Sequence, residues 1–72
     1  MVKSQRIKKS LQPGLLAAIN AVGTRYRLAK LLEIEPSSVL RWHRVPSERI
    51  IEVERVTGVS REILRPDLYR KS

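Results

Sequence analysis

The sequence of 72 residues contains no cysteine and a single histidine. Disulfide bonds and thiolate metal sites are therefore excluded, and His43 has no second imidazole or thiol with which to share a metal ion. The absence of cysteine suits a reducing cytoplasm, where we expect the protein to lie. We expect no metal and no cofactor.

The sequence also lacks long apolar segments and catalytic patterns. Its apolar runs are a few residues long, whereas a membrane-spanning helix needs about 20. No apolar signal core follows the basic N-terminus, and there is no glycine-rich phosphate loop. Glu52 and Glu54 are two residues apart on a predicted helix, so their side chains face different directions and cannot act as a pair. We therefore expect neither a membrane partner nor enzymatic activity.

Positive charge, by contrast, is abundant. Fifteen Lys and Arg residues against seven Asp and Glu residues give a net charge of +8. The excess lies in residues 1–10, with four basic and no acidic residues, and in residues 25–44, with five basic residues against Glu33 and Glu35. Residues 46–58 are slightly acidic. A cationic surface confined to part of a small protein favours a polyanionic partner.

The spacing of apolar residues predicts an all-α protein with five short helices around one core and no strands. The predicted helices span residues 11–22, 25–32, 36–43, 46–57 and 61–65. Together they form one domain over residues 11–69, with a flexible basic arm at 1–10 and a short tail at 70–72.

Residues that start and stop helices support these limits. Gly23 and Gly58 suit the ends of helices. Thr24 and Ser60 can cap the helices that follow them. Pro36 fits the first turn of a helix, because no N–H donor is needed there.

Residues 25–42, RYRLAKLLEIEPSSVLRW, form the most informative stretch. Its first helix carries an apolar stripe predicted to be buried, made of Leu28, Ala29, Leu31 and Leu32. Val39 and Trp42 lie three residues apart, so both are expected to pack into the core while Arg41 points away. Two helices joined by a tight turn in this way are typical of a helix-turn-helix motif, whose second helix enters the major groove of DNA.

Three segments resemble the Cro/repressor family of phage-type helix-turn-helix regulators, and more narrowly its YdaS-like Cro subgroup. They are AINAVG (18–23), RLAKLLEIEPSSVLRW (27–42) and VPSERIIEVERVTGVSREILRPDLY (45–69). The last segment is the most specific, because it joins a predicted helix to a capped turn and then to RPDLY. The resemblance implies a lambda-repressor-like fold. It also implies a nucleoid-associated, bacterial or phage-encoded protein that binds double-stranded DNA as a homodimer on a two-fold site.

Two glutamates depart from the family pattern. Glu33 stands where family turns have glycine, because one backbone position there prefers a positive φ; a glutamate is strained by about 1 kcal/mol. Glu35 stands where serine or threonine usually caps the recognition helix. It either weakens nonspecific affinity for DNA or accepts a hydrogen bond from the amino group of a cytosine.

Four residues of the predicted recognition helix are candidates for contact with base edges: Pro36, Ser37, Leu40 and Arg41. Arg41 either bonds a guanine through two parallel contacts or touches only phosphate or solvent. Leu40 either contacts a thymine methyl group or is an ordinary exposed leucine. Ser37 either bonds a base or a phosphate, or is solvated at the start of the helix.

Contacts with the DNA backbone are expected from nine residues: Arg25, Tyr26, Arg27, Ser38, Arg44, Lys3, Arg6, Lys8 and Lys9. The first three open a helix, and the N-terminus of a helix favours anions. Tyr26 alternatively packs beside the core with its hydroxyl outside, and Ser38 alternatively only completes the helix start. The basic arm either follows the minor groove or the phosphates, or remains solvated.

The sequence is compatible with two main functions. The first is a sequence-specific transcriptional regulator without a small-molecule ligand, whose homodimer is joined through Leu64, Leu68 and Tyr69. The second is a YdaS-like antitoxin, in which the apolar C-terminal surface binds a toxin protein and DNA binding is autoregulatory. Binding of RNA or a membrane surface through charge alone also fits the composition, but it predicts no preference among duplex sequences.

Overall fold

The computed structural model describes residues 11–69, and all regular structure in that range is helical. Five short α-helices follow one another, and a turn of 3₁₀-helix, η1, precedes the fourth. Their bounds are α1 Pro13–Val22, α2 Arg25–Leu32, α3 Pro36–Leu40, η1 Ser47–Arg49, α4 Ile50–Thr57 and α5 Arg61–Leu64. The predicted all-α fold of five short helices is confirmed.

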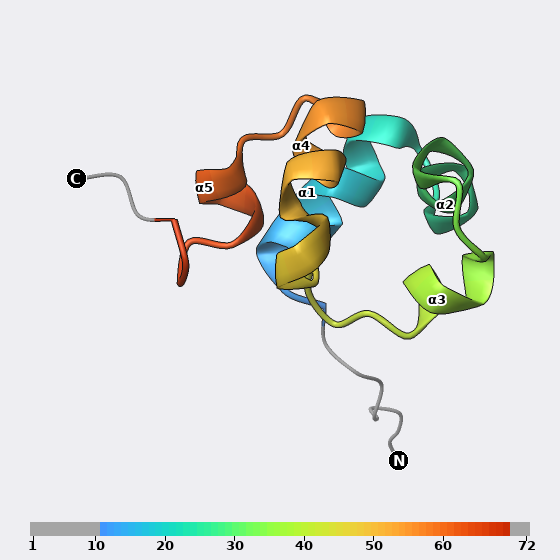
Figure 1. The fold of residues 1–72 in the computed structure, drawn as a ribbon, viewed down its shortest axis with the longest axis horizontal. Coiled ribbons are helices and arrows are strands. Elements are labelled where there is room, and N and C mark those ends of the chain that lie inside the picture. Colours follow the sequence, from blue (N-terminus) through green and yellow to red (C-terminus); the bar gives the residue numbers. More distant parts are fainter. Residues whose placement is uncertain (1–10, 70–72) are drawn as a thin grey trace, which may run out of the picture.

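One hydrophobic core holds these helices together. In Figure 1, α1 and α4 lie at the centre, α2 and α3 lie on one side of them, and α5 lies on the other. Among the helices of residues 11–69, α3 packs against α2 alone, whereas α1 and α4 both contact α2 and α5. The buried apolar residues of this core are Leu15, Ala18, Leu28, Ala29, Leu32, Val39, Val45, Ile50, Val53 and Leu64.

Six of the ten predicted helix limits are confirmed, whereas the first helix begins at Pro13 and not at residue 11. Gly23 and Gly58 end α1 and α4 with positive φ values of 111° and 79°. The hydroxyl of Thr24 accepts a 3.0 Å hydrogen bond from the backbone N–H of Arg27, so it caps α2. Ser60 occupies the N-cap position of α5, but its side chain accepts no capping hydrogen bond.

The helix predicted over residues 36–43 is shorter than expected, because α3 ends at Leu40. The N–H groups of Arg41 and Trp42 donate to carbonyl groups three residues earlier, so the helix tightens as it ends. Val45 is fully buried. It also precedes Pro46, and a residue before proline favours an extended backbone. The chain therefore leaves the helix to bring Val45 into the core.

The last two helices also differ from their predicted limits. The helix predicted from Pro46 starts as η1 and becomes α-helical at Ile50. The last helix ends at Leu64 instead of Arg65, which has φ −141° and ψ 77°. Arg65 precedes Pro66, and this proline disfavours a helical conformation in the residue before it.

Leu31 of α2, predicted to lie in a buried stripe, is exposed, and so is Leu16 of α1. Their neighbours Leu15 and Leu32 fill the core instead. Adjacent residues of an α-helix are separated by about 100° around its axis, so a narrow contact with the core buries one of two neighbouring leucines and not both.

The backbones of α1 and α5 lie close together at Gly14, which the sequence pattern did not single out. A Cβ atom at Gly14 would collide with the carbonyl oxygen of Leu64 and would lie 2.6 Å from that of Ile63. The absence of a side chain therefore allows the start of α1 to touch the backbone of α5 directly.

Candidate nucleic-acid interface

The turn between α2 and α3 contains a left-handed residue. Glu33 has φ 62° and ψ 42°, and it is the one non-glycine residue with a positive φ in the described part of the chain. Its N–H donates to the carbonyl of Lys30 at 3.1 Å, and the N–H of Ile34 donates to that of Ala29 at 3.0 Å. The prediction that this turn requires a positive φ at Glu33 is confirmed.

The α3 segment has one buried side and one exposed side. Val39 is fully buried, and Trp42 is half-buried and packs against the core, as predicted. Ser37, Leu40 and Arg41 are exposed, and their spacing of three and four residues places them on one side. Leu40 is 56% exposed. A partner that entered here would meet a serine, a leucine and an arginine without displacing any core residue.

The start of α3 is weakly capped. Glu35 occupies the N-cap position, and its side chain accepts no capping hydrogen bond, as expected for a glutamate. Pro36 follows at the first helical position, as predicted. Glu35 is exposed, whereas Pro36 and Ser38 are half-buried. The carboxylate of Glu35 is therefore free to face a partner at the same end of α3.

Three residues open α2 at its capped N-terminus. Arg25 is half-buried, Arg27 is exposed, and Tyr26 is 61% exposed. The alternative that Tyr26 packs beside the core is therefore wrong. Together with Thr24, these residues present two guanidinium groups and a phenol hydroxyl at a helix start, where anionic groups are favoured.

Ion pairing separates the charged residues into two groups. In residues 11–69, the ion pairs join Arg49 to Glu52, Arg61 to Glu54, and Arg65 to Asp67, at N–O distances of 2.9, 2.9 and 2.8 Å. All three pairs lie in the second half of the chain. None of these ion pairs includes a basic residue of α2, of α3 or of the loop that follows α3. The basic residues of that region are Arg25, Arg27, Lys30, Arg41 and Arg44. The positive charge of that region therefore remains available to a partner.

The loop of residues 41–46, which joins α3 to η1, is held at two backbone carbonyl groups. The N–H of Gln12 donates a 2.8 Å hydrogen bond to the carbonyl oxygen of His43. The Nη1 atom of Arg65 donates a 2.8 Å hydrogen bond to the carbonyl oxygen of Val45. Arg44 lies between these two anchors, and its side chain is exposed.

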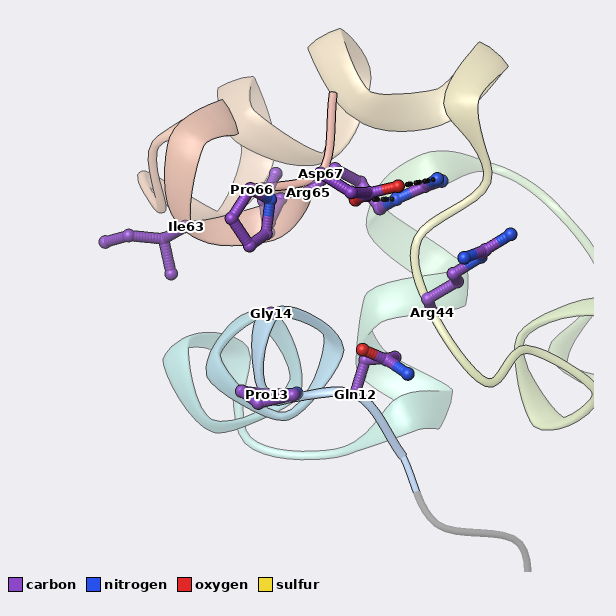
Figure 2. A pocket seen from close by; sticks show the side chains of 9 residues that line it. Gln12, Pro13, Gly14, Arg44, Ile63, Arg65, Pro66 and Asp67 are labelled. Atoms are coloured by element: carbon purple, nitrogen blue, oxygen red, sulfur yellow. Dashed lines mark hydrogen bonds and ion pairs between the residues drawn. The ribbon is translucent and has the colours of Figure 1, made fainter. Parts of the chain in front are cut away.

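Arg65 and Asp67 form a two-pronged ion pair beside this loop, which Figure 2 shows as dashed lines. Arg65 is only 7% exposed. Its Nε and Nη2 atoms donate to the two carboxylate oxygens of Asp67 at 2.9 and 2.8 Å. These hydrogen bonds lower the pKa of Asp67 to about 2, and the charge of Arg44 adds a smaller effect in the same direction. They also raise the pKa of Arg65 against the opposing effect of burial.

A pocket of about 200 Å³ lies between the start of α1 and the segment that follows α5 (Figure 2). It is lined by Gln12, Pro13, Gly14, Arg44, Ile63, Leu64, Arg65, Pro66 and Asp67. No residue of α3 lines it. The pocket is therefore separate from the exposed side of α3.

Comparison with known proteins identifies the family. Residues 15–72 match the family described as "Bacterial toxin YdaS". The chain belongs to the YdaS family. The structure of this YdaS-family chain is also similar to that of the Cro protein from putative prophage element Xfaso 1 in Xylella fastidiosa strain Ann-1. The TM-score is 0.73 and the identity is 37%, over 83% of this chain and 100% of the Cro protein. No curated protein matches the chain significantly. The resemblance to YdaS-like Cro proteins is confirmed.

Two further features of this YdaS-family protein bear on its function. Within residues 11–69, no group of three or more His, Asp or Glu side chains is placed to hold a metal ion. None of the helices in that range is long and apolar enough to cross a membrane.

The predicted self-contact residues do not all lie at the surface. Leu64 is only 1% exposed, so its prediction as a dimer contact is wrong. It faces inward because α5 packs against α1 at Gly14. Leu68 is 50% exposed. Tyr69 is half-buried against the core, and the guanidinium of Arg61 lies 5.7 Å from the centre of its ring.

The sequence did not single out three residues that shape this region, namely Gly14, Arg65 and Asp67. The RPD run placed an arginine and an aspartate close together, which is compatible with an ion pair. It gave no sign that Arg65 is buried or that its guanidinium reaches Val45, because that contact spans 20 residues of chain. The predicted arm residues Lys3, Arg6, Lys8 and Lys9 lie outside the described residues.

Proposed function

We propose that this YdaS-family protein is a sequence-specific, DNA-binding regulator of transcription of the Cro/repressor type, with α3 in the major groove. The exposed side of α3 carries the proposal, because Ser37, Leu40 and Arg41 lie in solvent while Val39 is buried behind them. A helix that reads a groove needs this arrangement. The similarity to a Cro protein supports the same function and a non-enzymatic role.

Within this proposal, Arg41 reads sequence most directly. Its guanidinium can bond the O6 and N7 atoms of guanine together. Arg41 follows the last residue of α3 with φ −87° and ψ −10°, so it extends the helical path by one residue. Pro36, Ser37 and Leu40 lie against the neighbouring base edges.

Contacts with phosphates fix the position of α3 on the duplex and add affinity without reading sequence. We assign them to the start of α2, to Ser38 in the first turn of α3, and to the loop that follows α3. The basic arm, residues 1–10, adds further contacts. It precedes Gln12, whose N–H donates to the carbonyl oxygen of His43. The residues proposed for these contacts are Arg25, Tyr26, Arg27, Ser38, Arg44, Lys3, Arg6, Lys8 and Lys9.

A homodimer is part of the proposal, because one recognition helix covers only about half a turn of DNA. Two copies related by a two-fold axis would read an inverted repeat. The exposed Leu68 and the half-buried Tyr69 are the proposed self-contacts.

Selection from a random duplex library with the purified protein tests this function. We expect the enriched sequences to share a motif that is repeated in inverted orientation. A variant with Ser37 and Arg41 both replaced by alanine is the control, and it should enrich no motif. If the wild-type protein enriches none either, the regulator proposal is wrong, and equal binding of single-stranded RNA would instead favour charge-driven binding.

The family name favours a second function, a role in a toxin–antitoxin pair. The sequence resemblance suggests the antitoxin, whereas the family description names a toxin. In either case, exposed apolar residues such as Ile63 and Leu68 would bind the partner protein, and the protein would act in the cytoplasm of a bacterium. Induced expression of this chain alone separates the roles. Growth arrest on expression of this chain indicates a toxin. If a co-purifying partner arrests growth when it is expressed alone, and this chain relieves that arrest, the chain is an antitoxin.

A further inference from the structure

The RPDLY segment, residues 65–69, is not explained by the proposed contacts of α3. We propose that Arg65 and Asp67 are positioning residues for DNA binding, which hold the loop of residues 41–46 so that Arg41 and Arg44 approach the duplex from a fixed backbone. This inference rests on the proposed function, and it assigns a role to two residues that are remote from the exposed side of α3.

The geometry of the guanidinium supports this role. The planar group of Arg65 is fixed by two hydrogen bonds to the carboxylate of Asp67, at 2.9 and 2.8 Å. A planar group held at two points directs its remaining donors. Nη1 is then aimed at the carbonyl oxygen of Val45, which it reaches at 2.8 Å. Asp67 therefore acts on the loop through Arg65.

The loop has little freedom once these bonds form. The carbonyl groups of His43 and Val45 are both held, by Gln12 and by Arg65. Only Arg44 separates them, so its backbone is restrained on both sides. The side chain of Val45 is fully buried as well. An arginine on a restrained backbone loses less conformational freedom when it binds, which favours affinity.

A purely electrostatic role for Asp67 predicts the opposite effect. Asp67 lies near enough to Arg44 for the charge of Arg44 to lower its pKa. Without a positioning role, this carboxylate would only weaken the attraction of phosphates to the loop. Its removal would then strengthen binding to every duplex. The positioning role predicts weaker binding to the preferred duplex, so the two explanations differ in sign.

The test is Asp67→Ala, with Glu54→Ala as the matched control. Each change removes one negative charge and one arginine ion pair, but the carboxylate of Glu54 accepts its hydrogen bonds from the side chain and the N–H of Arg61, which lies outside the loop. The probes are the duplex enriched by the wild-type protein and a shuffled duplex of equal length. For Asp67→Ala we expect about five- to tenfold weaker binding to the enriched duplex, on which both Arg41 and Arg44 lose their fixed positions. We expect a smaller loss, of about twofold, on the shuffled duplex, on which only the phosphate contact of Arg44 is weakened. Glu54→Ala should leave the ratio of the two affinities unchanged.

Trp42 provides a second measurement that needs no DNA. It is the single tryptophan of the sequence, it lies in the loop, and it packs against the core. When the loop is no longer held by Arg65, the indole ring of Trp42 should become more exposed. Iodide should therefore quench the fluorescence of Asp67→Ala more strongly than that of the wild type. Arg65→Lys, which keeps the charge but not the planar fork, should behave in the same way, and Glu54→Ala should not.

The outcomes separate the two proposals. If wild type prefers a duplex and folded Asp67→Ala keeps the full preference or binds all duplexes more tightly, the positioning role is wrong and the regulator proposal stands. If the wild-type protein prefers no duplex, the regulator proposal is wrong, and the positioning role, which depends on it, is wrong as well. Unchanged quenching in both Asp67→Ala and Arg65→Lys also overturns the positioning role. Should circular dichroism show that Asp67→Ala is unfolded, Arg65→Lys is judged by the same criteria.

Discussion

Gly14 of α1 lies directly against the carbonyl oxygen of Leu64 of α5. Replacement of Gly14 by alanine should therefore lower the free energy of unfolding by about 1–3 kcal/mol, because the new methyl group can be accommodated only if the two backbones separate. Urea denaturation measures this change. Asn20→Ala, at an exposed position of the same helix, should stay within about 0.5 kcal/mol of wild type. A Gly14→Ala protein of wild-type stability would contradict the close packing of α1 and α5.

Glu33→Gly should stabilise the protein by about 0.5–1 kcal/mol. The left-handed conformation of Glu33, with φ 62°, is strained for residues with a Cβ atom, and glycine adopts it freely. Glu35→Gly is the matched control, since it removes the same charge from a residue with φ −67°, where glycine brings only added freedom in the unfolded chain. Thermal denaturation compares the two variants. If both shift the melting temperature in the same direction by the same amount, charge and not backbone strain is responsible.

Arg41→Ala should weaken binding to the preferred duplex by about 1–3 kcal/mol and relax the preference at one base pair. Arg55→Ala provides the control, because it removes the same charge from an exposed position on α4, outside the proposed interface. Fluorescence anisotropy with single-base variants of the duplex measures both effects. Equal losses on preferred and shuffled DNA would show that Arg41 contacts only phosphate.

Glu35→Ser should raise the affinity for all duplexes. It removes a negative charge that is exposed at the start of α3, and it supplies an N-cap that stabilises the helix by about 0.5–1 kcal/mol. Titrations at several salt concentrations separate the electrostatic contribution from the other effects. A loss confined to the preferred duplex would instead indicate that Glu35 bonds a cytosine, and no change would mean that it faces away from DNA.

The ion pair between Asp67 and Arg65 should make the stability of the fold depend on pH. The pKa of Asp67 is lowered from 3.8 to about 2 in the folded protein, so the pair stabilises the fold above about pH 4 and ceases to do so as the pH falls toward about 2. Asp67→Asn should therefore melt at a lower temperature than wild type at neutral pH, and the difference should shrink in acid. A difference that stays constant over this range would show that the charge of Asp67 is not involved.

The parts of the fold that depend on local chemistry were predictable. Thr24 caps α2 because its hydroxyl reaches an N–H three residues later, and the positive φ at Glu33 follows from the geometry of a tight turn between two helices. Both are properties of a few adjacent residues. For the same reason the pattern placed Val39 and Trp42 against the core correctly.

Features that depend on contacts between distant segments were not predictable. The burial of Leu64 is decided by how α5 meets α1, and nothing near this leucine in the sequence records that contact. The early end of α3 likewise depends on the burial of Val45. In the candidate interface, the exposed residues followed from helical spacing, whereas the anchoring of the loop by Gln12 and Arg65 did not.

The hydrogen bond from the N–H of Gln12 to the carbonyl oxygen of His43 affects how the protein should be prepared for binding assays. Any purification tag or fluorescent protein fused upstream of this domain enters it beside the end of α3, where the duplex is proposed to lie. A bulky fusion tethered close to this point can compete with DNA for space, and an assay that used it would then understate the affinity. Tag-free protein, cleaved before measurement, is therefore the appropriate material for the binding experiments proposed above.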